Sequence, residues 1–164
     1  MSVTTRVAGP EDAEAIARIY NEGIDDRIAT FETVHRSPGE VRAWFGGTHP
    51  IVVVEDGDHI DGRVIAFAST SVYRPRECYR GIAEFSVYVA REARGRGAGR
   101  VAMSGLFDAA RAAGFWKLVS RVLVENVASR GLLKAVGFRE VGTYEKHGKL
   151  DGVWCDAVIV ERLL

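Results

Sequence analysis

The feature that most restricts what this chain can fold into is an apolar strand that runs directly into a basic, glycine-rich turn and then a helix. The strand covers Ala83–Val89, four arginines follow between positions 91 and 100, and Gly95, Gly97 and Gly99 interrupt them. Glycines allow a tight turn with exposed N–H groups, and the first turn of a helix adds unpaired N–H groups and a positive dipole end. With guanidinium groups added, such a segment is typical of a site for phosphate oxygens.

Four interpretations of this turn compete. A Walker loop needs glycine and lysine followed by serine or threonine, which occurs nowhere in the chain. A dinucleotide fingerprint needs G-x-G-x-x-G, which the spacing of Gly95, Gly97 and Gly99 does not fit. The pattern Arg-x-x-Gly-x-Gly, formed by Arg94, Gly97 and Gly99, resembles the coenzyme A pyrophosphate loop of the GNAT acetyltransferase superfamily. The remaining alternative is a basic surface loop without a ligand.

The charge distribution also indicates an anionic ligand. The chain has 22 basic and 22 acidic residues, and a net charge of zero argues against a globally basic nucleic-acid-binding protein. Residues 1–62 carry 5 basic and 12 acidic residues, residues 63–134 carry 13 and 5, and residues 135–164 carry 4 and 5. The net charge of +8 in the middle segment favours binding of anions there. We interpret the acidic first segment as solvated surface.

The hydrophobic pattern predicts one mixed α/β domain over residues 1–164, built around a single sheet. A composition of 47% hydrophobic and 27% charged residues is that of a globular chain. Helices are expected to begin near Gly9-Pro10-Glu11-Asp12 and, with a capping box, at Ser37, and to cover about 98–113 and 128–135. Strands are expected at 3–7, 51–55, 63–72, 81–90, 116–123, 138–144 and 153–160.

Several features exclude other classes of protein. Two cysteines and four scattered histidines fit neither a disulfide scaffold nor a metal motif. No apolar run approaches the roughly 20 residues of a membrane span, and the first residues do not resemble a signal peptide. We therefore expect a soluble, cytoplasmic protein with reduced cysteines, no metal site, and no membrane or nucleic-acid partner.

A second pattern strengthens the resemblance to the GNAT superfamily. Asn126-Val127-Ala128-Ser129, followed by Leu132-Leu133 and Val136-Gly137-Phe138, is similar to the superfamily's signature for the helix beside the pantetheine arm. Asparagine is also a good helix cap, which is a local explanation for Asn126. The resemblance implies a single GNAT domain. Its central, twisted, mostly antiparallel sheet of about six to seven strands is flanked by about four helices, and strands splay to form the acetyl-CoA cleft.

A narrower resemblance extends over nearly the whole chain. The motifs that carry it are Ile19-Tyr20-Asn21, Ala29-Thr30-Phe31-Glu32-Thr33, Ala43-Trp44-Phe45, Tyr73-Arg74-Pro75-Arg76, Tyr79-Arg80, Glu84 before Ser86-Val87-Tyr88-Val89, and Lys146-His147-Gly148-Lys149 with Trp154 and Asp156. They are similar to the phosphinothricin N-acetyltransferase group, which includes enzymes acting on methionine sulfoximine, methionine or arsinothricin. The resemblance implies acetyl transfer from acetyl-CoA to the α-amino group of a small amino-acid-like acid, and a homodimer.

The resemblance assigns the catalytic base to Glu84. Side chains alternate along a strand, so Glu84 leaves the apolar face of Ala83 and Phe85 and can line a cleft. A carboxylate there can take the proton of an ammonium group, directly or through one water. An exposed strand glutamate without a catalytic role is the alternative.

The cofactor residues expected from the resemblance are those of the strand, the glycine-rich turn and the second signature. Backbone N–H groups of Val87–Val89 are expected to bind the pantetheine amides and the oxyanion. The full set is Val87, Tyr88, Val89, Arg94, Gly95, Arg96, Gly97, Ala98, Gly99, Arg100, Asn126 and Ser129. Many members of the superfamily have a tyrosine as general acid where this chain has Leu133, so we expect solvent to protonate the leaving thiolate.

The acceptor is expected to meet the basic and aromatic residues before Glu84. A guanidinium fork matches a carboxylate or phosphinate, so we expect at least one of Arg74, Arg76 and Arg80 to bind the acid group; a solvated loop is the alternative. Tyr79 lies among them, Phe31 is a candidate pocket wall, and Trp44 is expected in the core. His147 and Lys149 lie in a glycine-containing hairpin that either closes the site or is plain surface.

Two other functions stay open from the sequence. One is an acetyltransferase for another amine, such as a protein N-terminus, a polyamine or an antibiotic. The other is a non-catalytic acyl-CoA-sensing module. The three arginines argue against a polyamine, and Glu84 beside an intact glycine-rich turn argues against a sensor.

Overall fold

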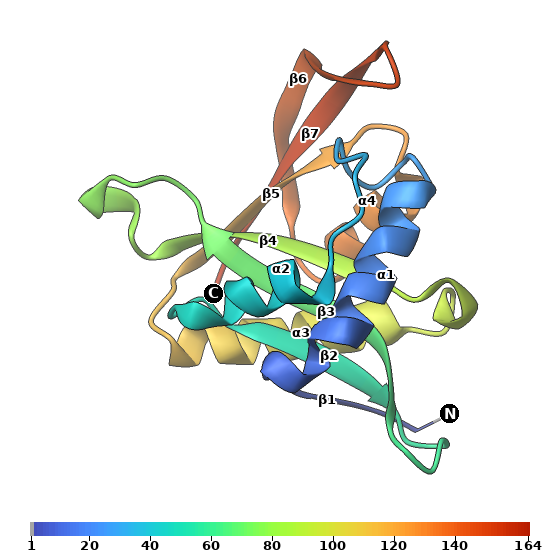
Figure 1. The fold of residues 1–164 in the computed structure, drawn as a ribbon. Helices are drawn as coiled ribbons and strands as arrows, with labels where there is room; N and C mark the ends of the chain where they lie inside the picture. The colour runs from blue at the N-terminus through green and yellow to red at the C-terminus, as the bar shows by residue number, and fades with distance from the viewer. Residues whose placement is uncertain (1) are drawn as a thin grey trace.

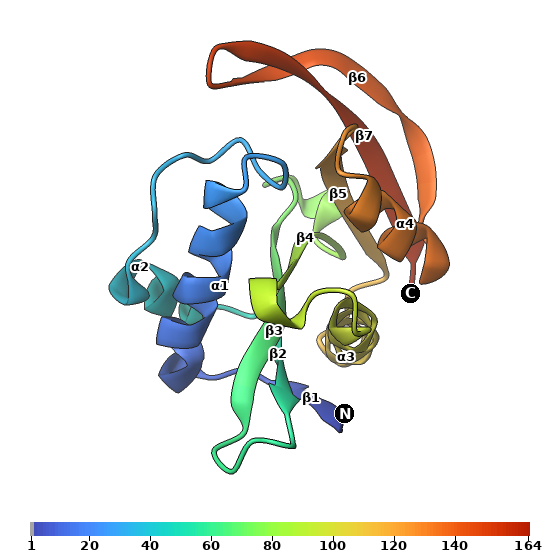
Figure 2. The same ribbon diagram turned by 90° about the vertical axis from the view of Figure 1, so that its right-hand side faces the viewer.

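A computed structural model describes residues 2–164 as a seven-stranded sheet with helices on both faces (Figures 1 and 2). The strand order is β1-β2-β3-β4-β5-β7-β6, and every neighbouring pair is antiparallel except β4 and β5. The strands are β1 Val3–Val7, β2 Ile51–Asp56, β3 Arg63–Val72, β4 Ile82–Val89, β5 Lys117–Leu123, β6 Arg139–Leu150 and β7 Val153–Leu163. The mostly antiparallel α/β sheet expected from the sequence is confirmed.

Four α-helices cover this sheet within the described residues: α1 Ala13–Asp25, α2 Pro38–Arg42, α3 Ala98–Ala112 and α4 Val127–Ala135. Figure 2 shows α1 and α2 on one face of β1–β4 and α3 on the other, with α4 beside the β6–β7 hairpin. The predicted capping box at Ser37 is formed: its hydroxyl accepts from the Glu40 N–H, and the Glu40 carboxylate accepts from the Ser37 N–H.

The core lies where α1 and α3 sandwich the central strands. Val52–Val54 of β2 and Phe67 of β3 are fully buried, because these strands are covered on both faces. Ile16 of α1 and Leu106 of α3 are buried against them from opposite sides. Trp44, expected in the core, is only partly buried and packs against the core, edge-on to Tyr20.

The β6–β7 hairpin is longer than the sequence pattern predicted. The expected strand 138–144 instead reaches Leu150, so His147 and Lys149 lie within β6 and the turn is at Asp151–Gly152. A register irregularity between Tyr144 and Gly148 interrupts the pairing with β7 just beyond the predicted end of the strand.

The feature of the fold that opens a site is the divergence of β4 from β5. These parallel strands pair only from Ile82–Lys117 to Glu84–Val119, and within residues 2–164 no backbone pairing joins them further along. β4 stays paired with β3 as far as Val89. One edge of β4 is therefore available beyond Glu84.

Candidate active site

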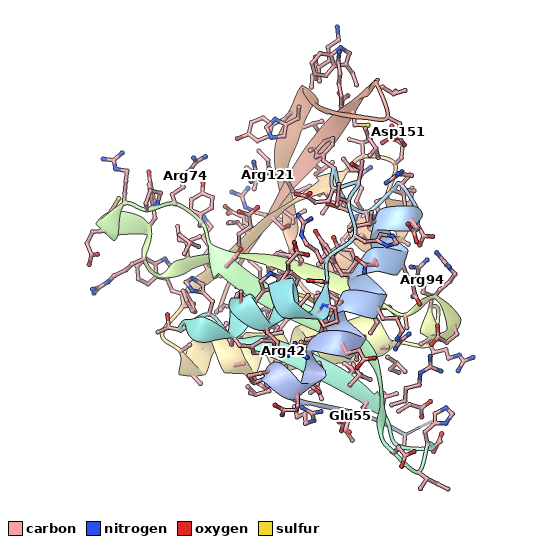
Figure 3. All side chains as sticks on the ribbon, in the orientation of Figure 1. Arg42, Glu55, Arg74, Arg94, Arg121 and Asp151 are labelled. Carbon is pink, nitrogen blue, oxygen red and sulfur yellow. The ribbon has the colours of Figure 1, made fainter. Side chains whose placement is uncertain are left out.

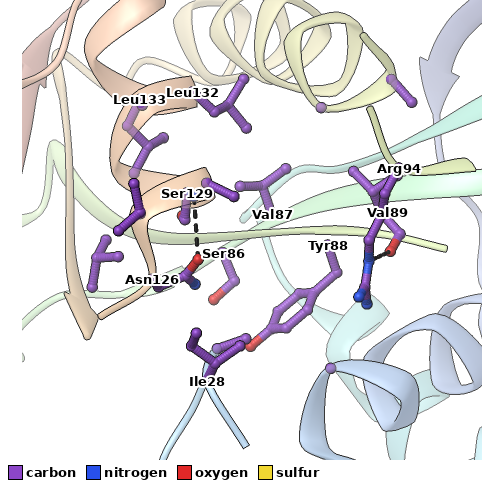
Figure 4. Close-up of a pocket in the computed structure, with 18 of the residues that line it drawn as sticks. Ile28, Ser86, Val87, Tyr88, Val89, Arg94, Asn126, Ser129, Leu132 and Leu133 are labelled. Atoms are coloured by element: carbon purple, nitrogen blue, oxygen red, sulfur yellow. Dashed lines mark hydrogen bonds between the residues drawn. The ribbon is translucent and has the colours of Figure 1, made fainter. Parts of the chain in front are cut away.

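A cavity of about 830 Å³ opens where β4 and β5 separate. Its walls come from the free part of β4, the turn before α3, the first turns of α3 and α4, β5, and the segment after α1 (Figure 4). The opening joins elements that are far apart in the sequence and includes most of the cofactor residues expected from the sequence. Of those, the lining contains Val87, Tyr88, Val89, Arg94, Gly95, Gly97, Ala98, Gly99, Arg100, Asn126 and Ser129.

The free edge of β4 presents backbone polar groups to this cavity. The Ser120 hydroxyl donates to the Phe85 carbonyl at 2.9 Å, and the Arg94 Nε donates to the Val89 carbonyl at 3.2 Å. Both carbonyls therefore point away from β3. Because backbone groups of alternate strand residues face the same edge, the N–H and C=O of Val87 also face the cleft. Within the predicted segment Val87–Val89, Val87 thus has its backbone directed into the opening.

The glycine-rich turn adopts the conformation that its residues were expected to allow. Gly95 and Gly97 have φ values of +76° and +86°, where an L side chain would be strained. Gly97 caps α3 without a side-chain acceptor, so the first N–H groups of the helix point out of its end. A Cβ on Gly99 would lie 2.8 Å from Leu132 Cδ2, so glycine there allows α3 and α4 to approach. The turn can accommodate an anion at a positively polarised helix end.

Asp26, which the sequence analysis did not single out, lies beside this turn. Its carboxylate accepts from Arg94 Nη1 and Arg91 Nη2, each at 2.7 Å. Burial acts to raise the pKa of Asp26, but the hydrogen bonds from Arg91 and Arg94 outweigh it and hold the pKa below its usual range. An acidic pair at the end of an amphipathic helix gave no signal that distinguishes this aspartate from solvated surface.

The second signature has a structural role at the start of α4. The Asn126 side chain accepts a hydrogen bond from the Ser129 N–H at 3.2 Å (Figure 4), so the local explanation for Asn126 holds in this structure. Both residues line the cavity. Leu133, at the position of the expected general acid, is buried in the core and also lines the cavity.

Glu84 lies at the last paired position of β4, where the cleft begins. Its Oε1 accepts from Arg121 Nη2 at 3.0 Å, and the Arg121 Nη1 lies 3.4 Å from His147 Nε2. The His147 ring stacks on Tyr144, so Arg121 bridges β4, β5 and β6. Arg121 was not predicted from the sequence. The available signal was a second cation, after Lys117, on the strand face that also carries Val119.

Tyr88 is the aromatic residue that lines the cavity on the α1 side, and Phe31 lies outside the lining. Tyr88 stacks on Phe67 and meets Tyr20 edge-on, and burial raises the pKa of its hydroxyl well above the usual range. Phe31, a predicted pocket wall, lies against Gly148 of β6, where a Cβ would come within 2.8 Å of its ring. The segment after α1 therefore touches the β6–β7 hairpin across the opening (Figure 2).

The loop that carries the predicted acceptor arginines projects from the sheet between β3 and β4 (Figures 1 and 3). Arg74 lies over the Tyr73 ring, Arg76 lies over the Tyr79 ring, and Arg80 pairs with Glu77. None of the three lines the cavity. The pKa of Arg74 is raised, chiefly by a hydrogen bond to Tyr73, with Tyr144 of β6 among the smaller contributors. Their role toward an acceptor stays a prediction.

Comparison with known proteins settles the family. Residues 16–138 match the family model described as Acetyltransferase (GNAT) family. The chain belongs to the GNAT acetyltransferase family. This confirms the resemblance drawn from the glycine-rich turn and the Asn126 signature.

Individual GNAT relatives match over almost their whole length. The chain is 33% identical to an L-methionine sulfoximine/L-methionine sulfone acetyltransferase of Pseudomonas paraeruginosa, over 98% of this chain and 94% of the relative. It is 32% identical to a phosphinothricin N-acetyltransferase of Streptomyces coelicolor, over 99% and 96%. A phosphinothricin acetyltransferase from Sinorhizobium meliloti, solved in complex with acetyl-CoA, superposes with a TM-score of 0.90 at 33% identity, over 100% and 89%. The narrower resemblance to the phosphinothricin N-acetyltransferase group is also confirmed.

The features of the cavity in this chain fit acetyl-CoA independently of the comparison with relatives. It combines an open strand edge for amide groups and a glycine turn with helix N–H groups for phosphates. Glu84 lies outside the lining itself, next to Phe85 and in contact with Arg121, which both line the cavity. Residues 2–164 contain no helix long and apolar enough to cross a membrane. The same residues contain no cluster of three or more side chains able to hold a metal ion.

Proposed function

We propose that this chain transfers the acetyl group of acetyl-CoA to the α-amino group of a small amino-acid-like acid. The observation that carries the proposal is Glu84, a carboxylate at the point where β4 leaves β5 and the cavity begins. The names of the relatives support the choice of acceptor: phosphinothricin, methionine sulfoximine and similar compounds are amino acids with an added acid-like or polar group. Acetylation of such toxic amino acids would confer resistance to them.

The cofactor would be held by three parts of the cavity. The free backbone edge at Val87–Val89 would bind the pantetheine amides as an added strand does. The N–H groups of the turn Gly95–Gly99 would bind the phosphates, with Arg94 and Arg100 of the lining and Arg96 from just outside it. Asn126 and Ser129 would line the arm from α4. Bound there, acetyl-CoA supplies a thioester whose C–S bond breaks as the amine forms its C–N bond.

Glu84 would act on the acceptor amine. An amino-acid amine arrives as ammonium near neutral pH, and only the neutral form has the lone pair needed for attack. Oε1 of Glu84 is held by Arg121, and within residues 2–164 the structure gives Oε2 no hydrogen-bond partner. Oε2 can therefore accept the proton, while the Val87 N–H donates to the carbonyl oxygen that gains negative charge. With Leu133 in place of an acid, the departing thiolate takes its proton from solvent.

The acceptor's acid group would meet the residues that lie outside the cavity lining. We propose that at least one of Arg74, Arg76 and Arg80 binds it, with Tyr79 and Phe31 as neighbouring walls.

The decisive test is Glu84→Gln, which keeps the shape of the side chain and removes its basicity. We expect kcat/KM to fall by about one to three orders of magnitude, with loss of the acidic limb of its pH profile and unchanged affinity for coenzyme A. The matched control is Glu140→Gln, a strand glutamate that also pairs with one arginine and lies outside the cavity lining. Near-wild-type turnover in Glu84→Gln would overturn the assignment.

Two finer properties belong to the same proposal. We propose a homodimer, supported by the exposed apolar side chains of the β6–β7 hairpin, among them Tyr144, Val153 and Trp154. We also propose a cytoplasmic location, where acetyl-CoA is made and cysteines stay reduced. Sedimentation of the purified chain tests the first property, and fractionation of the source cells tests the second.

A further inference from the structure

Arg121 is the cation that the structure places at the inner end of the cavity. It lines the cavity from β5, and its side chain is 47% exposed. A guanidinium has five N–H donors. In this structure one is directed at Glu84 Oε1, and Nη1 approaches His147. The remaining donors can reach a ligand without breaking the contact with Glu84.

The other arginines of the cavity are placed for a different part of the ligand. Arg94 and Arg100 lie at the glycine-rich turn and the start of α3, and Arg94 is paired with Asp26. Arg121 alone among the cavity's arginines lies beside the catalytic carboxylate. Arg121 has the same charge as Arg94 and Arg100 but differs from them in position, because it lies beside Glu84 and they lie at the glycine-rich turn.

The Glu84–Arg121 pair matches the charges of an α-amino acid. Such an acceptor carries its ammonium group and its carboxylate on one carbon, so the two charges lie within a few ångströms of each other. The interacting atoms of Glu84 and Arg121 are 3.0 Å apart. One acceptor can therefore direct its amine to Glu84 and its α-carboxylate to Arg121 at the same time. An acid group at the end of a side chain is several bonds away and cannot meet this pair together with the amine.

We propose that Arg121 binds the α-carboxylate of the acceptor and that this contact restricts the enzyme to free α-amino acids. The inference rests on the proposed function and adds the group that is recognised. His147, supported by its stack on Tyr144, holds the guanidinium from the β6 side. The arginines of the β3–β4 loop are left for the second, side-chain acid of acceptors such as phosphinothricin.

The test combines a variant with a matched pair of acceptors. Arg121→Gln removes the charge, and each enzyme is measured with one amino acid that the wild type acetylates and with the α-carboxamide of that amino acid. The carboxamide keeps the amine and the side chain but carries no negative charge. The ratio of variant to wild type for each acceptor cancels the difference in basicity between the two amines.

In Arg121→Gln we expect kcat/KM for the free acid to fall about 10- to 100-fold more than kcat/KM for the carboxamide, mainly through KM. Both acceptors lose the contact that holds Glu84, but only the acid loses its ion pair. An equal fall for both acceptors would mean that Arg121 only positions Glu84, and would overturn the proposal. Arg121→Lys keeps the charge without the fork, and we expect it to restore part of the difference between acid and carboxamide. If Arg121→Gln does not fold, Arg121→Lys is measured with the same two acceptors in its place.

The control and the wild-type enzyme separate this inference from the proposed function. Arg111→Gln alters an arginine that is also 47% exposed and carboxylate-paired, but on α3 and outside the cavity, and it should leave both acceptors unaffected. If wild type acetylates the acid and the carboxamide equally well, the carboxylate is not recognised and only this inference falls. If wild type acetylates other amines but no free amino acid, the proposed function falls with it.

Discussion

Two arginine-rich segments flank β4, and the structure uses them differently. The segment after β4 runs from Arg91 to Arg100 and lies at the cavity, between a free strand edge and the start of α3. The segment before β4 runs from Arg74 to Arg80, projects from the sheet, and has each arginine against a tyrosine ring or Glu77. Both have the charge to bind an acid, but only the first is built into the cavity wall.

The difference shows that the position of a segment relative to the sheet decides what its charges can do. The segment after β4 begins where β5 has moved away, so backbone N–H groups and guanidinium groups face the same opening. The segment before β4 precedes the three residues that still pair with β5, so no strand edge is open beside it. Arg121, a single cation on β5, reaches the opening that the three loop arginines do not line.

The largest effect on stability and on binding of coenzyme A is expected at Gly99, which lies in the first turn of α3 at the end of the arginine-rich segment after β4. In Gly99→Ala the added Cβ would lie 2.8 Å from Leu132 Cδ2, so the Leu132 side chain, which also lines the cavity, must shift. We expect a free energy of unfolding lower by about 1–3 kcal/mol and a large loss of affinity for coenzyme A. Thermal unfolding and calorimetric titration measure the two effects.

Gly131→Ala is the matched control, because it too adds a methyl group to a helix that borders the cavity. Nothing lies within 4 Å of the new Cβ, and alanine favours helix, so we expect unchanged or higher stability. Similar losses in the two variants would mean that the contact with Leu132 is not what requires glycine.

A smaller effect is expected from the charges themselves. Arg100→Ala removes a cation from the cavity wall, and we expect the dissociation constant of coenzyme A to rise about 10-fold or more, with a weaker dependence on salt. Arg80→Ala removes a cation from the projecting loop and should leave that constant unchanged. Equal weakening by both variants would show that general positive charge, and not position, attracts the cofactor.

Local patterns predicted most of the fold and one side of the site. Alternation and capping residues located the strands and helices, and the glycines and Arg94 located the cavity wall, because these features are fixed by neighbours in the sequence. The predicted end of β6 at residue 144 was wrong. The strand continues to Leu150 after an irregularity in its pairing with β7, and such an irregularity depends on the partner strand.

Residues that meet only in three dimensions were the ones missed. Arg121 is 37 positions from Glu84 and becomes its partner only because parallel β4 and β5 share a register there. Asp26 is far in sequence from Arg91 and Arg94 and meets them only when α1 packs on β4. Neither contact leaves a spacing pattern that a single sequence reveals.

The smallest effect is expected at Asp26, which competes with the cofactor for Arg94. Asp26→Asn removes the carboxylate that accepts from Arg91 and Arg94. We expect coenzyme A to bind about 2- to 5-fold more tightly, because Arg91 and Arg94 then no longer have to break an ion pair with Asp26 before they bind a phosphate. Asp25→Asn is the control: its carboxylate pairs with His35 instead, and the affinity should not change.

The same carboxylate has a defined pH dependence. Because its pKa is lowered in the folded chain, the stability that Asp26 contributes is complete above the ordinary pKa of aspartate and is lost as the pH falls through the lowered value. Wild type and Asp26→Asn should therefore differ in melting temperature near neutral pH and converge in acid. Weaker binding of coenzyme A by Asp26→Asn would mean that Asp26 orients Arg94 toward the phosphates instead of competing with them, and the first segment would then depend on α1 for its function.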